Sequence, residues 1–202
     1  MIIYYTHRYK ELDLKSHELL EVAIADYTGD KERASLLVSN LKRDDSHDYE
    51  GKPYIEGFDE FSISHSDKSW AVLIGKRPCG LDIQYEKMCN CGEIAQRFFN
   101  SEDAAVVAGM HMPGGQSTED SVAEFFRIWT KREAFTKAIG ESVFMEDFPP
   151  FAMHSSAVHG SDRYYINNIV LPDSDRLYAA ICLEANEDID EKLIYKEIYV
   201  KE

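Results

Sequence analysis

The chain has 202 residues, of which 44% are hydrophobic, and 22 Lys and Arg against 37 Asp and Glu give it a formal net charge of −15. A chain of this length and composition can bury a core without disulfides or a structural metal, as one domain or two small ones. The negative charge argues against nonspecific binding to nucleic acid or to an anionic membrane surface.

Cysteine usage and the lack of long apolar runs indicate the compartment. No run of eighteen apolar residues is present, and the first ten residues resemble a strand rather than a signal peptide. Four cysteines at irregular spacing do not make a disulfide framework. Cys89 and Cys91 lack the second pair of ligands that a zinc site needs. We therefore expect a cytoplasmic protein with no metal at these cysteines.

The first part of the chain is predicted to hold one helix and several short strands. Branched and aromatic residues at 2–6 predict a strand, and apolar residues three and four apart predict a helix over 16–27. A polar stretch follows. Alternating apolar residues and turn residues then predict an antiparallel meander of four strands, at 53–56, 59–64, 69–75 and 79–85.

The second part is predicted to begin with helices and to end with strands. Apolar periodicity predicts helices at 92–99, 101–110 and 119–139. Branched and aromatic runs separated by acidic turns predict strands at 163–170, 176–183 and 193–200. This order of elements predicts an α+β fold with two similar halves that meet near residue 80.

The first polar segment consists of GKPY at 51–54 and FSISHS at 61–66. Gly51 and Pro53 shape a turn, Lys52 supplies a cation, and Ser64 and His65 supply donors suited to phosphate oxygens. A histidine that merely occupies a strand end is the competing interpretation.

The second polar segment is GLDIQ at 80–84. Period-two alternation places Asp82 and Gln84 on one face of a strand and Leu81 and Ile83 on the other. An aspartate in an apolar strand is costly unless it is paired, and coordination of a hard cation such as Mg²⁺ would satisfy it. The alternative is an edge strand with a solvated face.

The third polar segment is WTKREAFTK at 129–137, inside the longest predicted helix. Glu133 and Lys137 are four residues apart and share one helix face. Taken alone, such a pair is typical of a surface ion pair.

Together these segments resemble the signature of the Sfp-like 4′-phosphopantetheinyl transferase family. The family pattern is approximately G-K-P, then F-N-x-S-H-S, then G-(I/V)-D-(I/V/L)-E, then W-(S/T)-x-K-E-(A/S)-x-x-K. EIAQRFFNSED at 93–103 matches a further family segment, in which Glu102 takes the place of an acidic residue. Two positions depart from the pattern: Gln84 replaces a carboxylate, which should weaken metal binding, and Arg132 replaces a lysine.

The resemblance implies a fold and a division of the chain. The fold is a pseudo-dimer of two similar lobes, each with a small antiparallel sheet and helices, and coenzyme A binds in the cleft between them. The implied N-terminal lobe spans 1–79, and the implied C-terminal lobe, with the metal-binding and catalytic helix, spans 80–202.

The resemblance also assigns roles to the polar residues. Glu133, Lys137 and His65 resemble catalytic residues. Asp82, Gln84 and Glu133 resemble the residues at the family's Mg²⁺ site. The residues that resemble those around the coenzyme A substrate are Gly51, Lys52, Pro53, Ser64, His65 and Lys137. Lys15 and His17 are candidates for contact with its 3′-phosphate.

The implied activity is that of a holo-carrier-protein synthase. It is an Mg²⁺-dependent transfer of 4′-phosphopantetheine from coenzyme A to a serine of an apo acyl or peptidyl carrier protein, which releases adenosine 3′,5′-bisphosphate. The carrier is expected to dock near residues 100–120. We expect a monomer that binds neither nucleic acid nor membrane. Two alternatives are a catalytically impaired module that binds coenzyme A or a carrier protein, and another Mg²⁺-dependent phosphoryl transferase or hydrolase.

Overall fold

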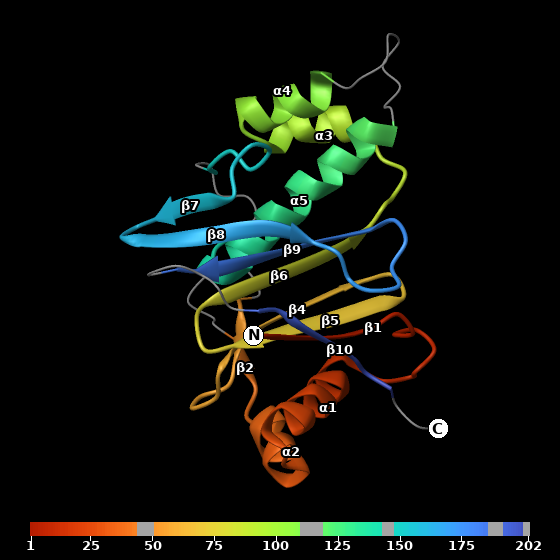
Figure 1. The fold of residues 1–202 in the computed structure, drawn as a ribbon, viewed down its shortest axis with the longest axis vertical. Coiled ribbons are helices and arrows are strands. Elements are labelled where there is room, and N and C mark those ends of the chain that lie inside the picture. Colours follow the sequence, from red (N-terminus) through yellow and green to blue (C-terminus); the bar gives the residue numbers. More distant parts are fainter. Residues whose placement is uncertain (44–50, 110–118, 143–147, 186–191, 200–202) are drawn as a thin grey trace.

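Two four-stranded sheets organise the part of the chain that the structure describes. The structure is a computed structural model, and it describes residues 1–43, 51–109, 119–142, 148–185 and 192–199. In the first sheet the strand order is β10-β1-β5-β4, and in the second it is β6-β9-β8-β7. Figure 1 shows the sheets one above the other, with α1 and α2 at one end of the molecule and α3 and α4 at the other.

The first sheet and its helices come mainly from the first part of the chain. Their bounds are β1 (Ile2–Thr6), α1 (Ser16–Thr28), α2 (Lys31–Ser39), β2 (Lys42–Arg43), β3 (Pro53–Tyr54), β4 (Glu60–Ser66) and β5 (Ser69–Gly75). β2 and β3 form a separate antiparallel pair.

The second sheet and its helices follow in the chain. Their bounds are β6 (Cys79–Tyr85), α3 (Cys91–Phe98), α4 (Ser101–Gly109), α5 (Glu119–Ile139), β7 (Ser156–His159), β8 (Asp162–Ile169) and β9 (Leu177–Glu184). The last strand, β10 (Ile194–Glu197), returns to the first sheet and pairs in parallel with β1. The first sheet is therefore mixed, and the expectation that both sheets are antiparallel is wrong for it. The division of the chain at residue 80 and the similarity of the two lobes stay predictions.

The four predicted strands between residues 53 and 85 do not form one meander. β4 and β5 pair as an antiparallel hairpin, with Ser66 opposite Ser69. β6 instead pairs with β9, and so begins the second sheet. Alternation shows that a segment is a strand but does not identify its partner, and this is why the prediction failed here.

Three described elements, α2, β2 and β7, have no counterpart among the predicted ones. α2 begins after Asp30, whose side chain accepts a hydrogen bond from the backbone N–H of Arg33 at 2.9 Å. This contact is a typical helix cap. β7 is a four-residue edge strand that pairs only with β8.

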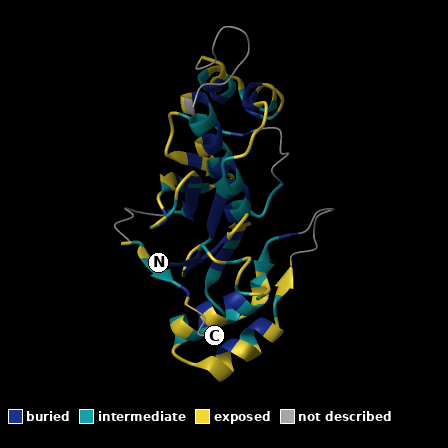
Figure 2. Cartoon of the chain, turned by 90° about the vertical axis from the view of Figure 1, so that its right-hand side faces the viewer, coloured by how far each residue is buried: buried dark blue, intermediate teal, exposed yellow. Residues whose placement is uncertain are grey.

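Alternation along the strands builds three apolar clusters. In β5, Trp70 and Val72 pack in the cluster that includes residues of α1, while Ala71 and Leu73 pack with Leu81 of β6. A third cluster joins the second sheet to α3, α4 and α5. Figure 2 shows these buried residues in the interior of the molecule, with exposed residues on the outer sides of the helices.

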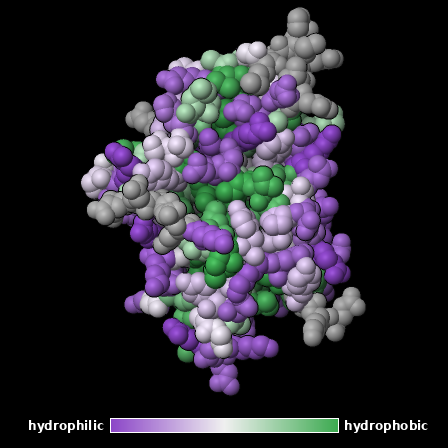
Figure 3. Space-filling view, viewed as in Figure 1, coloured by the Kyte–Doolittle hydropathy of each residue, from purple (hydrophilic) through white to green (hydrophobic). Residues whose placement is uncertain are grey.

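One face of the molecule is mainly hydrophilic (Figure 3). On the face seen in Figure 3, polar residues cover the upper and lower parts, and apolar residues gather near the middle. None of the helices in the described ranges is long and apolar enough to cross a membrane.

Candidate functional site

Gly80 brings α5 into direct contact with β6. A Cβ atom at this position would lie 1.8 Å from the carbonyl oxygen of Ala134 and 2.7 Å from the backbone nitrogen of Ala138. Only glycine leaves room for the helix backbone this close to a strand. The close contact places Glu133 and Lys137, on neighbouring turns of α5, beside the strand that carries Asp82.

Asp82 lies at the centre of a small polar network. Its side chain is largely buried, with a residue exposure of 6%. Its Oδ1 atom is 2.7 Å from Lys137 Nζ and accepts a hydrogen bond from the hydroxyl of Ser64 at 2.8 Å. Lys137 Nζ also donates to Ser64 Oγ at 3.1 Å and to the carbonyl oxygen of Leu81 at 3.2 Å. Lys137 therefore pairs with Asp82 of the neighbouring strand β6 and not with Glu133 on its own helix.

Glu133 has an unusual environment for a carboxylate. Burial and, to a smaller extent, the negative charge of Asp82 raise the pKa of Glu133 to about 7, although Lys137 and Arg132 act in the opposite direction. A carboxyl group with a pKa near neutrality can accept and release a proton under physiological conditions.

Oxygen atoms suited to a cation converge beside this network. Asp82, Gln84 and Glu133 line one cavity of about 300 Å³, together with His65, Trp129 and Lys137. The Nε2 atom of Gln84 donates to Ser66 Oγ at 2.9 Å and to the Tyr85 carbonyl at 3.0 Å. Asp82 Oδ2 and Gln84 Oε1 make no hydrogen bond to any described residue.

The donor set fits a hard cation. Within the described ranges, no group of three or more His, Cys, Asp or Glu side chains is arranged to hold a metal ion. The three candidates here are instead two carboxylates and one amide carbonyl, and all of them offer oxygen, the ligand atom that Mg²⁺ prefers.

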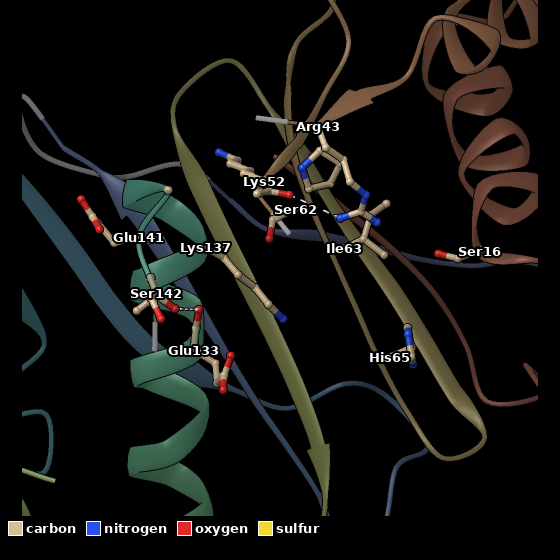
Figure 4. A pocket seen from close by; sticks show the side chains of 14 residues that line it. Ser16, Arg43, Lys52, Ser62, Ile63, His65, Glu133, Lys137, Glu141 and Ser142 are labelled. Carbon is tan, nitrogen blue, oxygen red and sulfur yellow. Dashed lines mark hydrogen bonds between the residues drawn. The ribbon is translucent and has the colours of Figure 1, made fainter. Parts of the chain in front are cut away.

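A larger cavity of about 490 Å³ adjoins the network and collects most of the residues that the resemblance places around coenzyme A. Gly51, Lys52, Pro53, His65 and Lys137 all line it, and Glu133 does as well. Figure 4 shows Glu133 and Lys137 on α5, facing His65 and Ser62 on β4. Ser64 lines the smaller cavity instead.

Several residues of the larger cavity are absent from the sequence-based prediction. Arg43 lines its wall and donates from Nη1 to the carbonyl oxygen of Gly51 at 3.4 Å. The pairing of β2 with β3 places Arg43 opposite Pro53. Arg43 belongs to the polar stretch that follows the first predicted helix, and nothing in the sequence connects it to the GKP turn. The other residues of this kind are Ser16, Ser62, Ile63, Thr136, Gly140, Glu141 and Ser142.

The basic residues around the larger cavity differ in their surroundings. Lys52 Nζ lies 3.1 Å from Glu60 Oε2, so its charge is partly balanced. His65 is exposed, and its ring lies 5.7 Å from that of Tyr9. Lys15 and His17, the candidates for the 3′-phosphate, are not among the residues that line the cavity, although their neighbour Ser16 is.

The surroundings of Glu102 and Arg132, the two remaining motif positions, are structural. Glu102 is exposed in the first turn of α4, whereas the adjacent Asp103 is fully buried and accepts hydrogen bonds from the backbone N–H groups of Phe151 and Ala152. Arg132 is buried, and its guanidinium lies 3.6 Å from the centre of the Phe148 ring. Burial lowers the pKa of Arg132 to about 10. The arginine at this departure from the family pattern therefore packs against an aromatic ring.

The expected docking region for the carrier lies partly outside the described residues. α4 and the start of α5 are described, whereas 110–118 are not. This expectation stays a prediction.

Comparison with known proteins agrees with the geometry. The family model of the 4′-phosphopantetheinyl transferase superfamily matches residues 78–182, which include β6 and α5. The chain is 30% identical over 95 residues to the 4′-phosphopantetheinyl transferase gsp of Aneurinibacillus migulanus, a match that covers 47% of this chain and 37% of that protein. It is 31% identical over 96 residues to the 4′-phosphopantetheinyl transferase psf-1 of Bacillus pumilus, covering 46% and 38%. The matches thus span less than two fifths of the length of either relative.

Proposed function

This chain belongs to the 4′-phosphopantetheinyl transferase superfamily, and on that premise we propose that it transfers 4′-phosphopantetheine from coenzyme A to a serine of an apo acyl or peptidyl carrier protein. The proposed reaction depends on Mg²⁺, releases adenosine 3′,5′-bisphosphate and makes the chain an enzyme of the holo-carrier-protein synthase type. The observation that carries the proposal is the convergence of Asp82, Glu133, Lys137 and His65 on one cavity.

The reaction requires one bond to form and one to break. The serine oxygen of the carrier attacks the phosphorus next to the pantetheine arm, and the bond from this phosphorus to the bridging oxygen breaks. The bridging oxygen leaves with adenosine 3′,5′-bisphosphate and carries the developing negative charge. Lys137 and His65 are proposed to stabilise that charge, because both side chains line the cavity proposed for the substrate.

Three residues are proposed to hold the cation. Asp82, Gln84 and Glu133 would supply the oxygen ligands of a Mg²⁺ ion, which would offset negative charge on the substrate's pyrophosphate. With only two carboxylates, the site attracts the cation less strongly than a site with three.

Glu133 is proposed as the group that accepts the serine proton. The carboxylate of Glu133 can accept that proton as the bond to phosphorus forms. The same residue lines both cavities and therefore lies where cation and substrate are expected to meet.

Intact mass spectrometry of a carrier protein tests the proposal. The purified chain is incubated with coenzyme A, Mg²⁺ and apo carrier proteins from fatty-acid, polyketide and peptide synthesis, and matched samples receive excess EDTA. We expect at least one carrier to gain the mass of one phosphopantetheine group with Mg²⁺ and none to gain it with EDTA.

The other outcomes identify the alternatives. Cleavage of coenzyme A without any carrier would indicate a hydrolase or another phosphoryl transferase. Binding of coenzyme A or a carrier without transfer would indicate a catalytically impaired module. Full transfer in excess EDTA would contradict the metal dependence.

A further inference from the structure

Three serines of β4 connect the two sheets. Ser62, Ser64 and Ser66 alternate along the strand, and each is at least 94% buried, with exposures of 2%, 5% and 6%. Their hydroxyl oxygens accept hydrogen bonds from three backbone N–H groups of β6. The donors are Leu81 to Ser62 at 2.9 Å, Ile83 to Ser64 at 3.1 Å and Tyr85 to Ser66 at 2.9 Å.

In this serine row, the side-chain hydroxyls accept the hydrogen bonds that backbone carbonyls accept inside a sheet. β4 is the edge of the first sheet and β6 is the edge of the second. A buried backbone N–H without a partner is costly, so the side-chain hydroxyls stabilise the junction of the two edges. Figure 1 shows β4 and β6 next to each other at this junction.

Ser64, in the middle of the row, makes more contacts than the junction requires. A serine hydroxyl has one hydrogen to donate and two lone pairs that accept. Ser64 accepts from Ile83 N–H and from Lys137 Nζ, and it donates to Asp82 Oδ1. All three positions of the hydroxyl are therefore used.

The neighbouring serines lack this combination. Ser62 contacts β6 only through the N–H of Leu81. Ser66 accepts from Tyr85 N–H and from the amide of Gln84. Of the three, Ser64 is thus the residue that contacts both Asp82 and Lys137.

The contacts determine which oxygen of Asp82 is available. The hydroxyl of Ser64 and the ammonium of Lys137 both bind Oδ1. Without the hydroxyl, the ammonium alone would hold the carboxylate, which could then rotate and present both oxygens to Lys137. With the Ser64 hydroxyl in place, Asp82 Oδ2 makes no hydrogen bond to any described residue and can bind a cation.

We infer that Ser64 is a positioning residue that orients Asp82 and Lys137 for the cation and the substrate, rather than a residue that chiefly lines the nucleotide site. This inference rests on the proposed function, because it takes Asp82 as a ligand of the cation. Hydrogen-bond partners of metal ligands typically change metal affinity 10–100-fold when they are removed.

The test compares Ser64→Ala with Ser62→Ala. Both variants lose one acceptor for a β6 N–H, but only Ser64→Ala loses the contacts to Asp82 and Lys137. Mg²⁺ affinity is measured by calorimetry in the presence of coenzyme A and without carrier, next to the unfolding temperature and to kcat and KM for coenzyme A. We expect both variants to unfold at a lower temperature, Ser64→Ala at least as low as Ser62→Ala, and Mg²⁺ affinity to fall about tenfold or more only in Ser64→Ala.

A conservative variant separates orientation from packing. Ser64→Thr keeps the hydroxyl, and we expect it to restore Mg²⁺ affinity to within about threefold of the unsubstituted protein, with a restored kcat. If Ser64→Ala does not fold, Ser64→Cys takes its place, because a thiol has similar shape but is a weak donor and acceptor.

Two results would overturn the inference without touching the proposed function. One is unchanged Mg²⁺ affinity in Ser64→Ala (or in Ser64→Cys, if that variant is used), and the other is an equal loss in Ser62→Ala. An unsubstituted protein that binds no Mg²⁺ with coenzyme A present would instead remove the metal site of the proposed function, and the inference with it.

Discussion

At the scale of single residues, the charge balance around Glu133 decides what the site can do. Asp82 lies close enough to raise the pKa of Glu133, and Lys137, which could lower it, is engaged with Asp82 at 2.7 Å. Burial adds to the effect, since a charged carboxylate loses hydration there. The protein therefore keeps a carboxyl group whose charged form is disfavoured in the folded state.

This imbalance predicts how Glu133→Gln changes stability with pH in the presence of EDTA. The pKa of Glu133 is raised from its ordinary 4.5 to about 7 on folding. The stabilising contribution of the protonated carboxyl is therefore complete below pH 4.5 and is lost as the pH rises through about 7. Glu133→Gln has no such loss. Relative to the unsubstituted protein, its free energy of unfolding should therefore gain on the order of 2 kcal/mol by pH 8.

Thermal unfolding of both proteins between pH 5 and pH 8 measures this difference. We expect the unfolding temperature of Glu133→Gln to exceed that of the unsubstituted protein at pH 8, and the difference to shrink toward pH 5. A difference that is the same at every pH would show that the carboxyl does not titrate in this range.

The sequence identified the chemistry of the site better than its extent. Asp82, Gln84, Glu133, His65 and Lys137 were recognisable because polar groups interrupt apolar strands or match a family pattern, and the structure places all five around one cavity. Arg43 and Ser142 were not recognisable, because they reach the larger cavity only through the folding of segments that carry no motif. The pairing of Lys137 with Asp82 rather than Glu133 likewise depends on contact between two distant elements.

At the scale of secondary structure, the contact between α5 and β6 holds the site together. α5 supplies Glu133 and Lys137, and β6 supplies Asp82 and Gln84. The two elements can touch because Gly80 has no side chain. The distance between the two halves of the site is therefore set by one glycine.

Gly80→Ala should destabilise the protein and impair transfer together. The new methyl group would overlap the carbonyl oxygen of Ala134, at 1.8 Å, so α5 must move away from β6. Overpacking of this kind typically costs about 1–3 kcal/mol and sometimes more. Thermal unfolding and the carrier mass assay measure the two effects.

Gly109→Ala is the matched control, because nothing lies within 4 Å of a Cβ atom at that position and its backbone is not left-handed. We expect it to leave stability unchanged or slightly raised. A Gly80→Ala protein as stable as this control would show that helix and strand are less closely packed than described.

Local patterns predicted elements but not their partners. The bounds of β5, β6 and α5 coincide with the predicted ranges, because alternation and helical periodicity are strong in all three. The placement of β6 beside β9, and of β10 beside β1, follows from long-range packing that no local pattern records. α2 was missed even though Asp30 caps it, because the helix has only 9 residues and buries only Ala34 and Val38.

At the scale of the whole molecule, the site lies where the two sheets meet. β4 of the first sheet supplies Ser64 and His65, while β6 and α5 of the second part supply the carboxylates and Lys137. The formal net charge of −15 opposes the approach of an anionic substrate. Arg43, Lys52, His65 and Lys137 bring local positive or protonatable groups to the cavity and offset this field there.

Transfer by an Asp82→Asn variant tests this arrangement most directly. Asparagine keeps the shape of the side chain and an oxygen that can accept from Ser64, but it removes the charge that the cation and Lys137 require. Asp162→Asn is the control, since Asp162 lies at the start of β8 and lines neither of the two cavities. The measurement is the initial rate of phosphopantetheine transfer to an apo carrier at saturating coenzyme A and Mg²⁺, followed by intact mass. We predict a rate on the order of a hundredfold or more below that of the control for Asp82→Asn, and a rate within about threefold of the control would contradict the account.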